Sequence, residues 1–328
     1  MSMEKISFGR LPTVLRSQEL IDKAFKKASE SAQKVQGPPR EVAIQREHQR
    51  IMVMTSTVSE HLSKSVAGFP SLMNLPPFYR DLVDAIFSID KLRKSLGTVG
   101  GAAKIVDKIR REQFRKLKYS RSPMEAAAIR RQAYGRISSI LKNLDGNLVF
   151  LKDVSKKLSD LPSVYVDMPT VVIAGYPNVG KSTLLRALTG SAPKIAPYPF
   201  TTTGLQLGYF EHSHQRYQVI DTPGLLDRPL EKRNPIELQA ISALKNLAKV
   251  IVFIMDPSET CGYEMRDQLH LLDDIEKMFA GMKVLVVANK TDMLNEEKIS
   301  QTREKRSGIF FVTASTGEGV GELRENLL

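Results

Sequence analysis

A glycine-rich segment with one lysine and one serine is the first part of the sequence that could do chemistry. Residues 175–182 read Gly-Tyr-Pro-Asn-Val-Gly-Lys-Ser, between the apolar run Val171–Ala174 and the helical pattern Thr183–Leu188. Glycines let such a loop fold with its N–H groups pointing inward, and a helix N-terminus adds a positive dipole end. Lys181 can then reach the β- and γ-phosphates of a nucleotide, and the Ser182 hydroxyl can hold Mg²⁺. The segment predicts a nucleoside triphosphate site.

Two further segments carry groups suited to the same phosphates. Asp221-Thr-Pro-Gly224 follows the predicted strand Tyr217–Ile220, so the Asp221 carboxylate can hold Mg²⁺ through water and the Gly224 N–H can donate to a γ-phosphate. Residues 196–204 read Ala-Pro-Tyr-Pro-Phe-Thr-Thr-Thr-Gly, and we expect this loop to close over the γ-phosphate. One threonine hydroxyl should complete the Mg²⁺ shell, and three adjacent threonines leave open which one it is.

The base is predicted to bind at Asn289-Lys-Thr-Asp292, which follows the apolar run Val284–Ala288. The Asp292 carboxylate can accept two hydrogen bonds, from N1–H and the exocyclic amine of guanine. Adenine offers no such donor pair, and an unpaired buried carboxylate is costly, so discrimination should be large. Lys290 should lay its aliphatic stem over the ring, and Asn289 should tie this loop to the phosphate loop.

The last predicted strand ends in Thr313-Ala-Ser315, whose Ala314 N–H can donate to guanine O6. Four of these segments follow strands at their carboxyl ends, where a doubly wound sheet binds its ligands: Gly175–Ser182, Asp221–Gly224, Asn289–Asp292 and Thr313–Ser315. Together they predict a site for GTP and GDP with Mg²⁺. The residues expected to bind the nucleotide are Gly175, Tyr176, Pro177, Asn178, Val179, Gly180, Lys181, Ser182, Thr183, Asp221, Thr222, Pro223, Gly224, Asn289, Lys290, Asp292, Thr313, Ala314 and Ser315.

The elements that must position these residues alternate between strand and helix. Helical patterns fill most gaps between the apolar runs, which is typical of a parallel sheet covered on both faces. We therefore predict an α/β domain over residues 166–328 with a doubly wound, mostly parallel, six-stranded sheet. Its predicted strands are Val171–Ala174, Leu205–Phe210, Tyr217–Ile220, Val250–Met255, Val284–Ala288 and Ile309–Thr313.

Residues 1–165 have the periodicity of helices and predict an all-α helical bundle. The clearest helix start is Ser122-Pro-Met-Glu125, where serine can cap, proline opens and glutamate completes a capping box. The apolar pattern continues from there to Leu161 without slipping at Asp145-Gly146, so we predict one helix of more than 30 residues. Further apolar faces at helical spacing are Ile51, Met54, Val58 and Leu62, and Phe78, Leu82, Ile86, Ile89 and Leu92.

The charge of the chain is concentrated in this helical half. Residues 1–160 carry 30 basic and 16 acidic residues, a net charge of +14, whereas the rest of the chain has a net charge of −2. The densest cluster spans residues 104–118, and Arg130, Arg131 and Arg136 follow it. Such an excess favours contact with phosphates over a merely solvated face. Few aromatic residues are available for stacking, so we expect recognition of folded RNA through its backbone and shape.

Composition excludes several other classes of protein. The apolar runs are far too short to cross a bilayer, and residues 1–20 contain no apolar leader region. The single cysteine, Cys261, excludes a disulfide framework, fits a reducing compartment and is expected to pack. His212 and His214 have no third ligand in range, so a hairpin turn is favoured over a metal site there. We expect an intracellular protein without a membrane partner.

The motifs Gly175–Ser182, Tyr198–Thr202 and Asp221–Asp227 resemble those of the Obg-type P-loop GTPases, and Arg228–Glu237 and Asp256–Gly262 resemble the nucleolar GTP-binding protein branch. The resemblance implies a GTPase that assembles the large ribosomal subunit by binding ribosomal RNA and subunit precursors, without specificity for DNA. It also implies Thr202 as the Mg²⁺ ligand beside Ser182 and Asp221. The long C-terminal extension of eukaryotic members is absent, so we expect a cytoplasmic, archaeal-type short form or a trimmed chain, and nucleolar localisation if the source is eukaryotic.

The sequence also bears on catalysis. The position after Gly224, where many GTPases carry a water-orienting glutamine, is Leu225, so we expect slow hydrolysis that depends on Lys181, Thr202, backbone donors and a partner. Asn178 fits either of two roles, a K⁺ ligand beside the phosphates or a residue chosen for loop geometry. A nucleotide-gated scaffold with negligible hydrolysis is the alternative function. An RNA-modifying enzyme is disfavoured because the helical half has no second catalytic constellation.

Overall fold

A computed structural model of the chain describes residue 8 and residues 11–199, 201 and 204–327. These residues form two compact units. One contains residues 11–74 and 87–159, and the other contains residue 8 and Leu75–Ile86 together with the described residues from Asp160 onward. None of the helices within the described ranges is long and apolar enough to cross a membrane.

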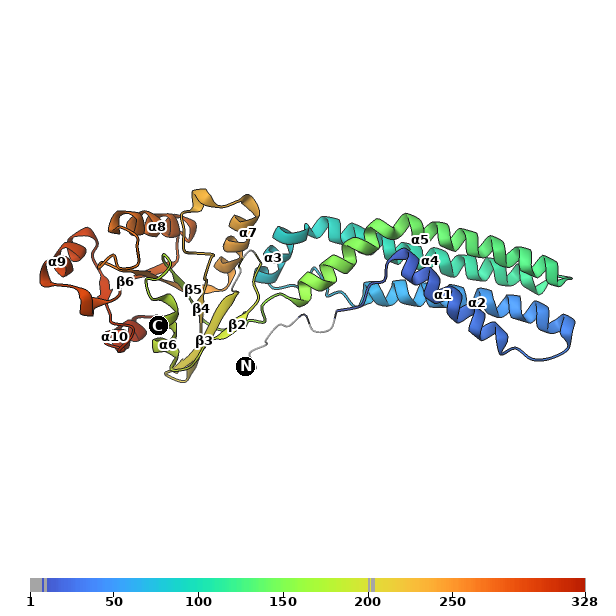
Figure 1. Ribbon diagram of the computed structural model, residues 1–328, viewed down its shortest axis with the longest axis horizontal. Helices are drawn as coiled ribbons and strands as arrows, with labels where there is room; N and C mark the ends of the chain where they lie inside the picture. Colours follow the sequence, from blue (N-terminus) through green and yellow to red (C-terminus); the bar gives the residue numbers. More distant parts are fainter. Residues whose placement is uncertain (1–7, 9–10, 200, 202–203, 328) are drawn as a thin grey trace. The chain divides into compact units, whose positions relative to one another are not determined.

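The first unit is a bundle of long helices (Figure 1). Its helices are α1 (Ser17–Gln33), α2 (Pro39–Ala67), α4 (Ile89–Lys118) and α5 (Pro123–Ser159). Helix α1 packs on α2, α2 on α4, α4 on α5, and α5 back on α1, so the apolar stripes close around one core. Fully buried side chains of this core include Leu20, Met54, Leu62, Val106, Leu141 and Leu148. The predicted helical bundle is confirmed.

Helix α5 begins and continues as its sequence predicts. Pro123 opens it, and the Ser122 hydroxyl accepts a hydrogen bond from the Glu125 N–H at 3.2 Å. The Glu125 carboxylate reaches the N–H of Arg121 (2.8 Å), one residue before the position that a standard capping box would use. The helix is 37 residues long in total and continues through Gly146 without a break, because its apolar stripe stays in phase with the core.

The second unit is a seven-stranded sheet with helices on both faces, one strand more than predicted. Helices α6 and α10 cover one face, and α7 and α8 cover the other (Figure 1). The strand order is β2-β3-β4-β1-β5-β6-β7. Strands β4, β1, β5, β6 and β7 are parallel, whereas β2 and β3 add an antiparallel edge. The strands are β1 (Thr170–Ala174), β2 (Lys194–Ala196), β3 (Leu205–His212), β4 (Gln215–Asp221), β5 (Ala248–Met255), β6 (Lys283–Ala288) and β7 (Ile309–Phe311).

The additional strand, β2, is a three-residue edge with two exposed residues, so it has no apolar run by which to predict it. The last strand ends at Phe311, two residues earlier than predicted: the Val312 N–H still donates to the Ala288 carbonyl, but Thr313 pairs with Glu318 of the loop that follows. The helices of this unit are α3 (Pro77–Phe87), α6 (Lys181–Thr189), α7 (Pro235–Ala243), α8 (Met265–Met278), α9 (Glu296–Lys305) and α10 (Val320–Asn326), with short 3₁₀ turns η1 (Leu230–Lys232), η2 (Leu244–Asn246) and η3 (Thr291–Met293).

Helix α3 lies within the helical half of the sequence, but its residues 77–86 belong to the same compact unit as the sheet. The Tyr79 hydroxyl donates to the Pro162 carbonyl (2.8 Å) and accepts from the Val164 N–H (3.1 Å). The face predicted to run from Phe78 to Leu92 is interrupted at Ser88, whose φ of 61° separates α3 from α4. Periodicity alone does not reveal such a break, because the apolar spacing continues across it.

Candidate nucleotide-binding site

The phosphate loop lies where the winding of the sheet reverses. Strand β1 lies between β4 and β5, and the chain builds β2, β3 and β4 on one side before crossing to the other side for β5. Ligands of doubly wound sheets bind beyond the carboxyl ends of the strands at such a point. Residues 175–180, between β1 and α6, occupy this position.

Two glycines give the loop its path. Gly175 has a φ of 140°, and a Cβ there would lie 2.2 Å from the Ile254 carbonyl oxygen of β5. Gly180 has a φ of 102°, and a Cβ there would lie 2.2 Å from the Asn289 Nδ2 atom. Any side chain at either position would therefore push the loop away from the sheet or from the base-binding loop.

The loop borders a cavity of about 430 Å³, which we call the phosphate cavity. Lys181 is buried at its edge, and its ammonium donates to the carbonyl oxygens of Gly175 (2.8 Å) and Tyr176 (2.7 Å). Burial lowers the pKa of Lys181, whereas the carboxylates of Asp221 and Asp227 act in the opposite direction. A cation at the first turn of α6 is suited to bind phosphate oxygens.

The predicted Mg²⁺ ligands Ser182 and Asp221 meet in this cavity. The Ser182 hydroxyl donates to Asp221 Oδ2 at 2.6 Å. Asp221 Oδ1 is buried and has no hydrogen-bond partner among the described residues. Burial raises the pKa of Asp221, against the effect of the Ser182 hydrogen bond and of Lys181. An orphaned carboxylate oxygen beside a hydroxyl is a donor set that fits Mg²⁺. The third predicted ligand, Thr202, lies outside the described residues.

Asn289 joins the phosphate loop to the base-binding loops, as predicted. Its side-chain Nδ2 donates to the Val179 carbonyl at 2.8 Å, and its Oδ1 accepts from the Ala314 N–H at 3.0 Å. One buried amide therefore holds three loops in a single frame. The Ala314 N–H, which was predicted to donate to guanine O6, already donates to Asn289. The predicted hydrogen bond to guanine would therefore have to share this N–H with Asn289.

Lys290 is anchored by an acidic residue for which the sequence had suggested no role. Its ammonium lies 2.7 Å from Asp256 Oδ2 and 2.8 Å from the Thr260 hydroxyl. Burial by itself would raise the pKa of Asp256, but hydrogen bonds from Lys290, Ser258 and Thr260 outweigh it and hold the pKa below its usual value. The ion pair fixes the end of the Lys290 side chain, and this fixes the course of its aliphatic stem.

The remaining predicted residues surround the same region. Asp292 is exposed in η3, and the hydroxyls of Thr291 and Thr313 lie 2.7 Å apart, which links the two base-binding loops. Asn178 is exposed at the phosphate cavity with a φ of 63°. The buried Thr222 hydroxyl donates to the Ile173 carbonyl (3.1 Å) and so anchors the loop after β4.

Two predicted loop residues have other environments. The Tyr176 ring packs on the Tyr263 ring, with centroids 4.1 Å apart, so this contact helps to hold the phosphate loop in place. Pro223 lines the phosphate cavity, where its ring can only shape the wall.

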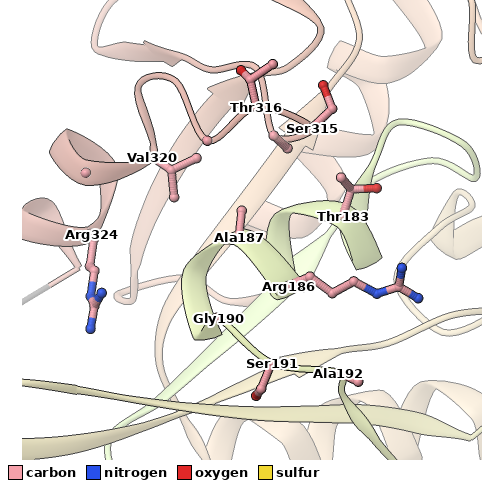
Figure 2. A pocket seen from close by; sticks show the side chains of 13 residues that line it. Thr183, Arg186, Ala187, Gly190, Ser191, Ala192, Ser315, Thr316, Val320 and Arg324 are labelled. Carbon is pink, nitrogen blue, oxygen red and sulfur yellow. The ribbon is translucent and has the colours of Figure 1, made fainter.

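A second cavity, of about 980 Å³, opens between α6 and α10. Figure 2 shows Ser315 and Thr316 on one side of it and Thr183 and Ala187 on the other. Thr183 also lines the phosphate cavity, so the two cavities meet at this residue. Because Ala314 and Ser315 border the larger cavity, residues predicted for the base and residues predicted for the phosphates line adjoining spaces. Asn289, Lys290 and Asp292, which the sequence predicts for the base, are not among the residues that line the larger cavity.

The phosphate cavity also contains residues that the sequence analysis missed. Gln206 lies opposite Asp221 in the β3–β4 register and lines the cavity, and Asp227 lines it from the loop after β4. Asp227 accepts from a backbone N–H three residues before it, whereas the usual Asx-turn bonds the backbone two residues after the Asp, so local turn patterns gave no signal for this contact.

Other residues considered for chemistry have structural roles. His212 ends β3, and Ser213 and His214 have positive φ values in an exposed hairpin turn, as predicted. Within the described ranges, no three His, Cys, Asp or Glu side chains gather as they would around a metal ion. Cys261 is buried, where its sulfur lies 3.7 Å from the Tyr263 carbonyl oxygen, so it packs as expected.

The sequence is similar to known proteins over both units. Residues 8–165 match the family model described as NOG1 N-terminal helical domain, and residues 235–292 match the model described as Nucleolar GTP-binding protein 1. An uncharacterized protein of Methanocaldococcus jannaschii is 42% identical over 303 residues, which cover 91% of this chain and 85% of that protein.

Eukaryotic relatives extend the comparison. Nucleolar GTP-binding protein 1 of Saccharomyces cerevisiae is 35% identical over 99% of this chain, but the match covers only 51% of the yeast protein. The chain thus spans about half the length of this and similar eukaryotic relatives. A crystal structure of a nucleolar GTP-binding protein 1 from Plasmodium falciparum is 32% identical, covers 51% of this chain and 88% of that chain, and has a TM-score of 0.44. The chain belongs to the nucleolar GTP-binding protein family of P-loop GTPases.

Proposed function

We propose that this protein binds and slowly hydrolyses GTP and that it acts as a switch in large ribosomal subunit assembly, with its helical bundle binding ribosomal RNA. The observation that carries the GTP part of the proposal is the position of Asn289. Its amide contacts both the Val179 carbonyl and the Ala314 N–H, so groups for phosphate and for base are held at a fixed separation. Calorimetry tests it, with tight binding of GTP and GDP and weak binding of ATP expected; equal binding of ATP would contradict it.

The phosphate cavity supports hydrolysis through positioning and charge. Lys181 would contact the β- and γ-phosphates, and Ser182 and Asp221 would hold Mg²⁺. An ion held by these two residues would supply positive charge that offsets the negative charge of the phosphates. Phosphoryl transfer needs little covalent chemistry from a protein, so these groups account for a basal rate.

A slow rate follows from Leu225. Its side chain is fully buried and apolar, so it cannot orient a water molecule toward the γ-phosphate. We expect activation by a partner or by K⁺ held at Asn178, which is exposed at the mouth of the cavity. Turnover in KCl compared with NaCl tests the second idea, and equal rates would remove K⁺ from the proposal.

A nucleotide-gated scaffold is the second candidate, favoured by the same buried Leu225. Single-turnover hydrolysis with and without large-subunit particles separates the two functions. The switch predicts a measurable basal rate that rises on the particles. The scaffold predicts no hydrolysis in either condition but particle binding that depends on the nucleotide.

The RNA part of the proposal is supported by one face of α4. Lys104, Lys108, Arg111 and Arg115 are spaced by four, three and four residues, so they form a stripe along one side of the helix. All four are exposed, and the opposite side of α4 is buried in the bundle. We call these four residues the basic stripe. It extends over about 16 Å at the 1.5 Å rise of an α-helix, long enough for several phosphates.

Ion pairs within the protein distinguish the stripe from other cations of the bundle. Arg130 pairs with Glu47, and Arg136 pairs with Glu112 at 2.9 Å. Among the described residues, no acidic side chain forms an ion pair with a member of the basic stripe. The stripe therefore offers its charge to an external polyanion, whereas Arg130 contributes to the packing of the bundle. Crosslinking the protein to cellular RNA and sequencing the captured fragments tests this part; recovery of no ribosomal RNA would contradict it.

A further inference from the structure

The Gly224 N–H, the donor expected to reach a γ-phosphate, already has an anionic partner in the protein. It donates to Asp227 Oδ2 at 2.7 Å. The Asp227 side chain is 14% exposed and lines the phosphate cavity together with Lys181 and Ser182. A hydrogen bond to a carboxylate is stronger than one between neutral groups, so this contact has a substantial cost of displacement.

The same peptide is held from its other side by Arg233. This guanidinium donates to the Gly224 carbonyl at 2.7 Å and to Asp227 Oδ1 at 3.3 Å. Its side chain is fully buried, and Glu237 of α7 lies 3.9 Å away. Asp227 and Arg233 thus clamp the Gly224 peptide through its N–H and its carbonyl, and we call this arrangement the Gly224 clamp.

A γ-phosphate and the Asp227 carboxylate are both anions, and both would accept a hydrogen bond from the Gly224 N–H. One N–H makes one strong hydrogen bond, and two anions at that donor would also repel each other. Asp227 is close enough to the phosphate-binding groups for its charge to act on both Lys181 and Asp221: it opposes the lowering of the Lys181 pKa by burial, and it adds to the raising of the Asp221 pKa by burial. GTP would have to displace the carboxylate, whereas GDP has no phosphate at this position.

We propose that Asp227 is a specificity-determining residue that competes with the γ-phosphate for the Gly224 N–H and so lowers the affinity for GTP relative to GDP. This inference rests on the proposed function as a GTP-binding switch. Displacement of Asp227 removes an acceptor from Arg233, which directly precedes the cap of α7. Binding of GTP is thereby linked to a rearrangement of residues 227–234, and GDP leaves the clamp in place.

The test compares the dissociation constants of GDP and of a non-hydrolysable GTP analogue, measured by calorimetry with Mg²⁺. In Asp227→Ala the affinity for the GTP analogue should rise about tenfold, the size expected for loss of one competing charge-assisted hydrogen bond. The affinity for GDP should stay within about twofold of the wild type. Asp227→Asn keeps an uncharged acceptor for the Gly224 N–H, so its affinity ratio should fall between wild type and Asp227→Ala.

The matched control is Glu231→Ala, which removes an exposed negative charge from the same loop and makes no contact with Gly224 among the described residues. Glu231→Ala should leave the ratio of the affinity for the GTP analogue to the affinity for GDP unchanged. An unchanged ratio in both Asp227 variants, or a selective loss of GTP affinity, would overturn the inference while leaving GTP binding intact. A wild-type protein that binds neither guanine nucleotide would instead overturn the proposed function and the inference with it. GDP affinity of the variants reports whether they are folded.

Discussion

The Asp221 carboxylate is less stable as an ion in the folded protein than in water. It is fully buried, and its Oδ1 atom has no hydrogen-bond partner among the described residues. An uncompensated buried charge opposes folding, so the position of Asp221 is better explained by the proposed Mg²⁺ site than by stability. Functional residues often carry such a cost, and here it lies at the carboxyl end of β4.

Asp221→Asn should raise the melting temperature at neutral pH by a few degrees and abolish Mg²⁺-dependent nucleotide binding. Because the folded-state pKa is raised, the contribution of Asp221 to stability is largest below its ordinary value of 3.8 and is lost as the pH rises through the raised pKa. The gain in the variant should therefore disappear in acid. Thermal unfolding at neutral pH and in acid measures the difference in melting temperature, and Asp273→Asn, at an exposed position, is the control. A variant no more stable than wild type at pH 7 would contradict the prediction.

Asp256 holds the ammonium of Lys290, and under the proposed function it would act on the base through that lysine as a positioning residue. Asp256→Asn removes the 2.7 Å ion pair, so we expect GDP and GTP to lose affinity equally, by about tenfold. Ser258→Ala is the control, since it removes a hydroxyl partner of Asp256 but leaves the ion pair. Equal losses for both nucleotides distinguish this effect from that of Asp227, which concerns the γ-phosphate alone. Unchanged affinities for both nucleotides would show that binding does not depend on the ion pair between Lys290 and Asp256.

The pH dependence of the Asp256 contribution is opposite to that of Asp221. Its pKa is lowered, so the stability that it supplies is complete above its ordinary value of 3.8 and is lost as the pH falls through the lowered pKa. The difference in unfolding free energy between wild type and Asp256→Asn should thus shrink in acid.

At the scale of elements, α7 follows the Gly224 clamp directly. Asn234 caps it by accepting from the Glu237 N–H at 2.8 Å, and Pro235 occupies its first position. Helix α9 has an equivalent cap, in which Asn295 accepts from the Lys298 N–H at 2.9 Å. The two helices therefore have the same local device, but only α7 is connected to the phosphate cavity.

Asn234→Ala and Asn295→Ala should each lower the free energy of unfolding by about 1 kcal/mol, because each removes one capping acceptor. Only Asn234→Ala should also change nucleotide binding, by shifting the ratio toward the GTP analogue as its looser helix start weakens the clamp. Denaturant titration and calorimetry measure the two effects. A comparable shift in Asn295→Ala would mean that the ratio follows global stability rather than the start of α7.

At the scale of the whole molecule, charge is divided between the two units. The triple substitution Lys104→Glu, Lys108→Glu and Arg111→Glu should reduce the slope of log affinity for ribosomal RNA against log salt by about 3, one for each lost phosphate contact. The matched control is the triple substitution of three exposed lysines of the sheet unit by Glu, at Lys245, Lys249 and Lys277. An equal change in the slope from both triple variants would assign the RNA contacts to net charge instead of the basic stripe.

Local sequence patterns were sufficient to predict the long α5 helix, the parallel strands and the linking role of Asn289. Each depends on residues close in the chain or on a motif whose loop has one stable geometry. They were insufficient for β2, which has no apolar run, and for α3, whose periodicity continues into α4 although Ser88 separates them. They also missed Asp227 and Asp256, because their partners are defined by how loops fold.

The sequence by itself determined which chemical groups are present and in what order along the chain, and hence two units, a guanine nucleotide site and a concentrated positive charge. Only the tertiary structure decided which donors are already paired. Lys181 is paired with two carbonyls, Gly224 with Asp227, and Ala314 with Asn289. The physical reason is that a backbone or side-chain donor pairs with the acceptor that lies within reach in the folded chain. For Lys181 and Gly224 that acceptor depends on the path of their own loops, and for Ala314 it lies on a loop 25 residues away that the folded sheet brings beside it.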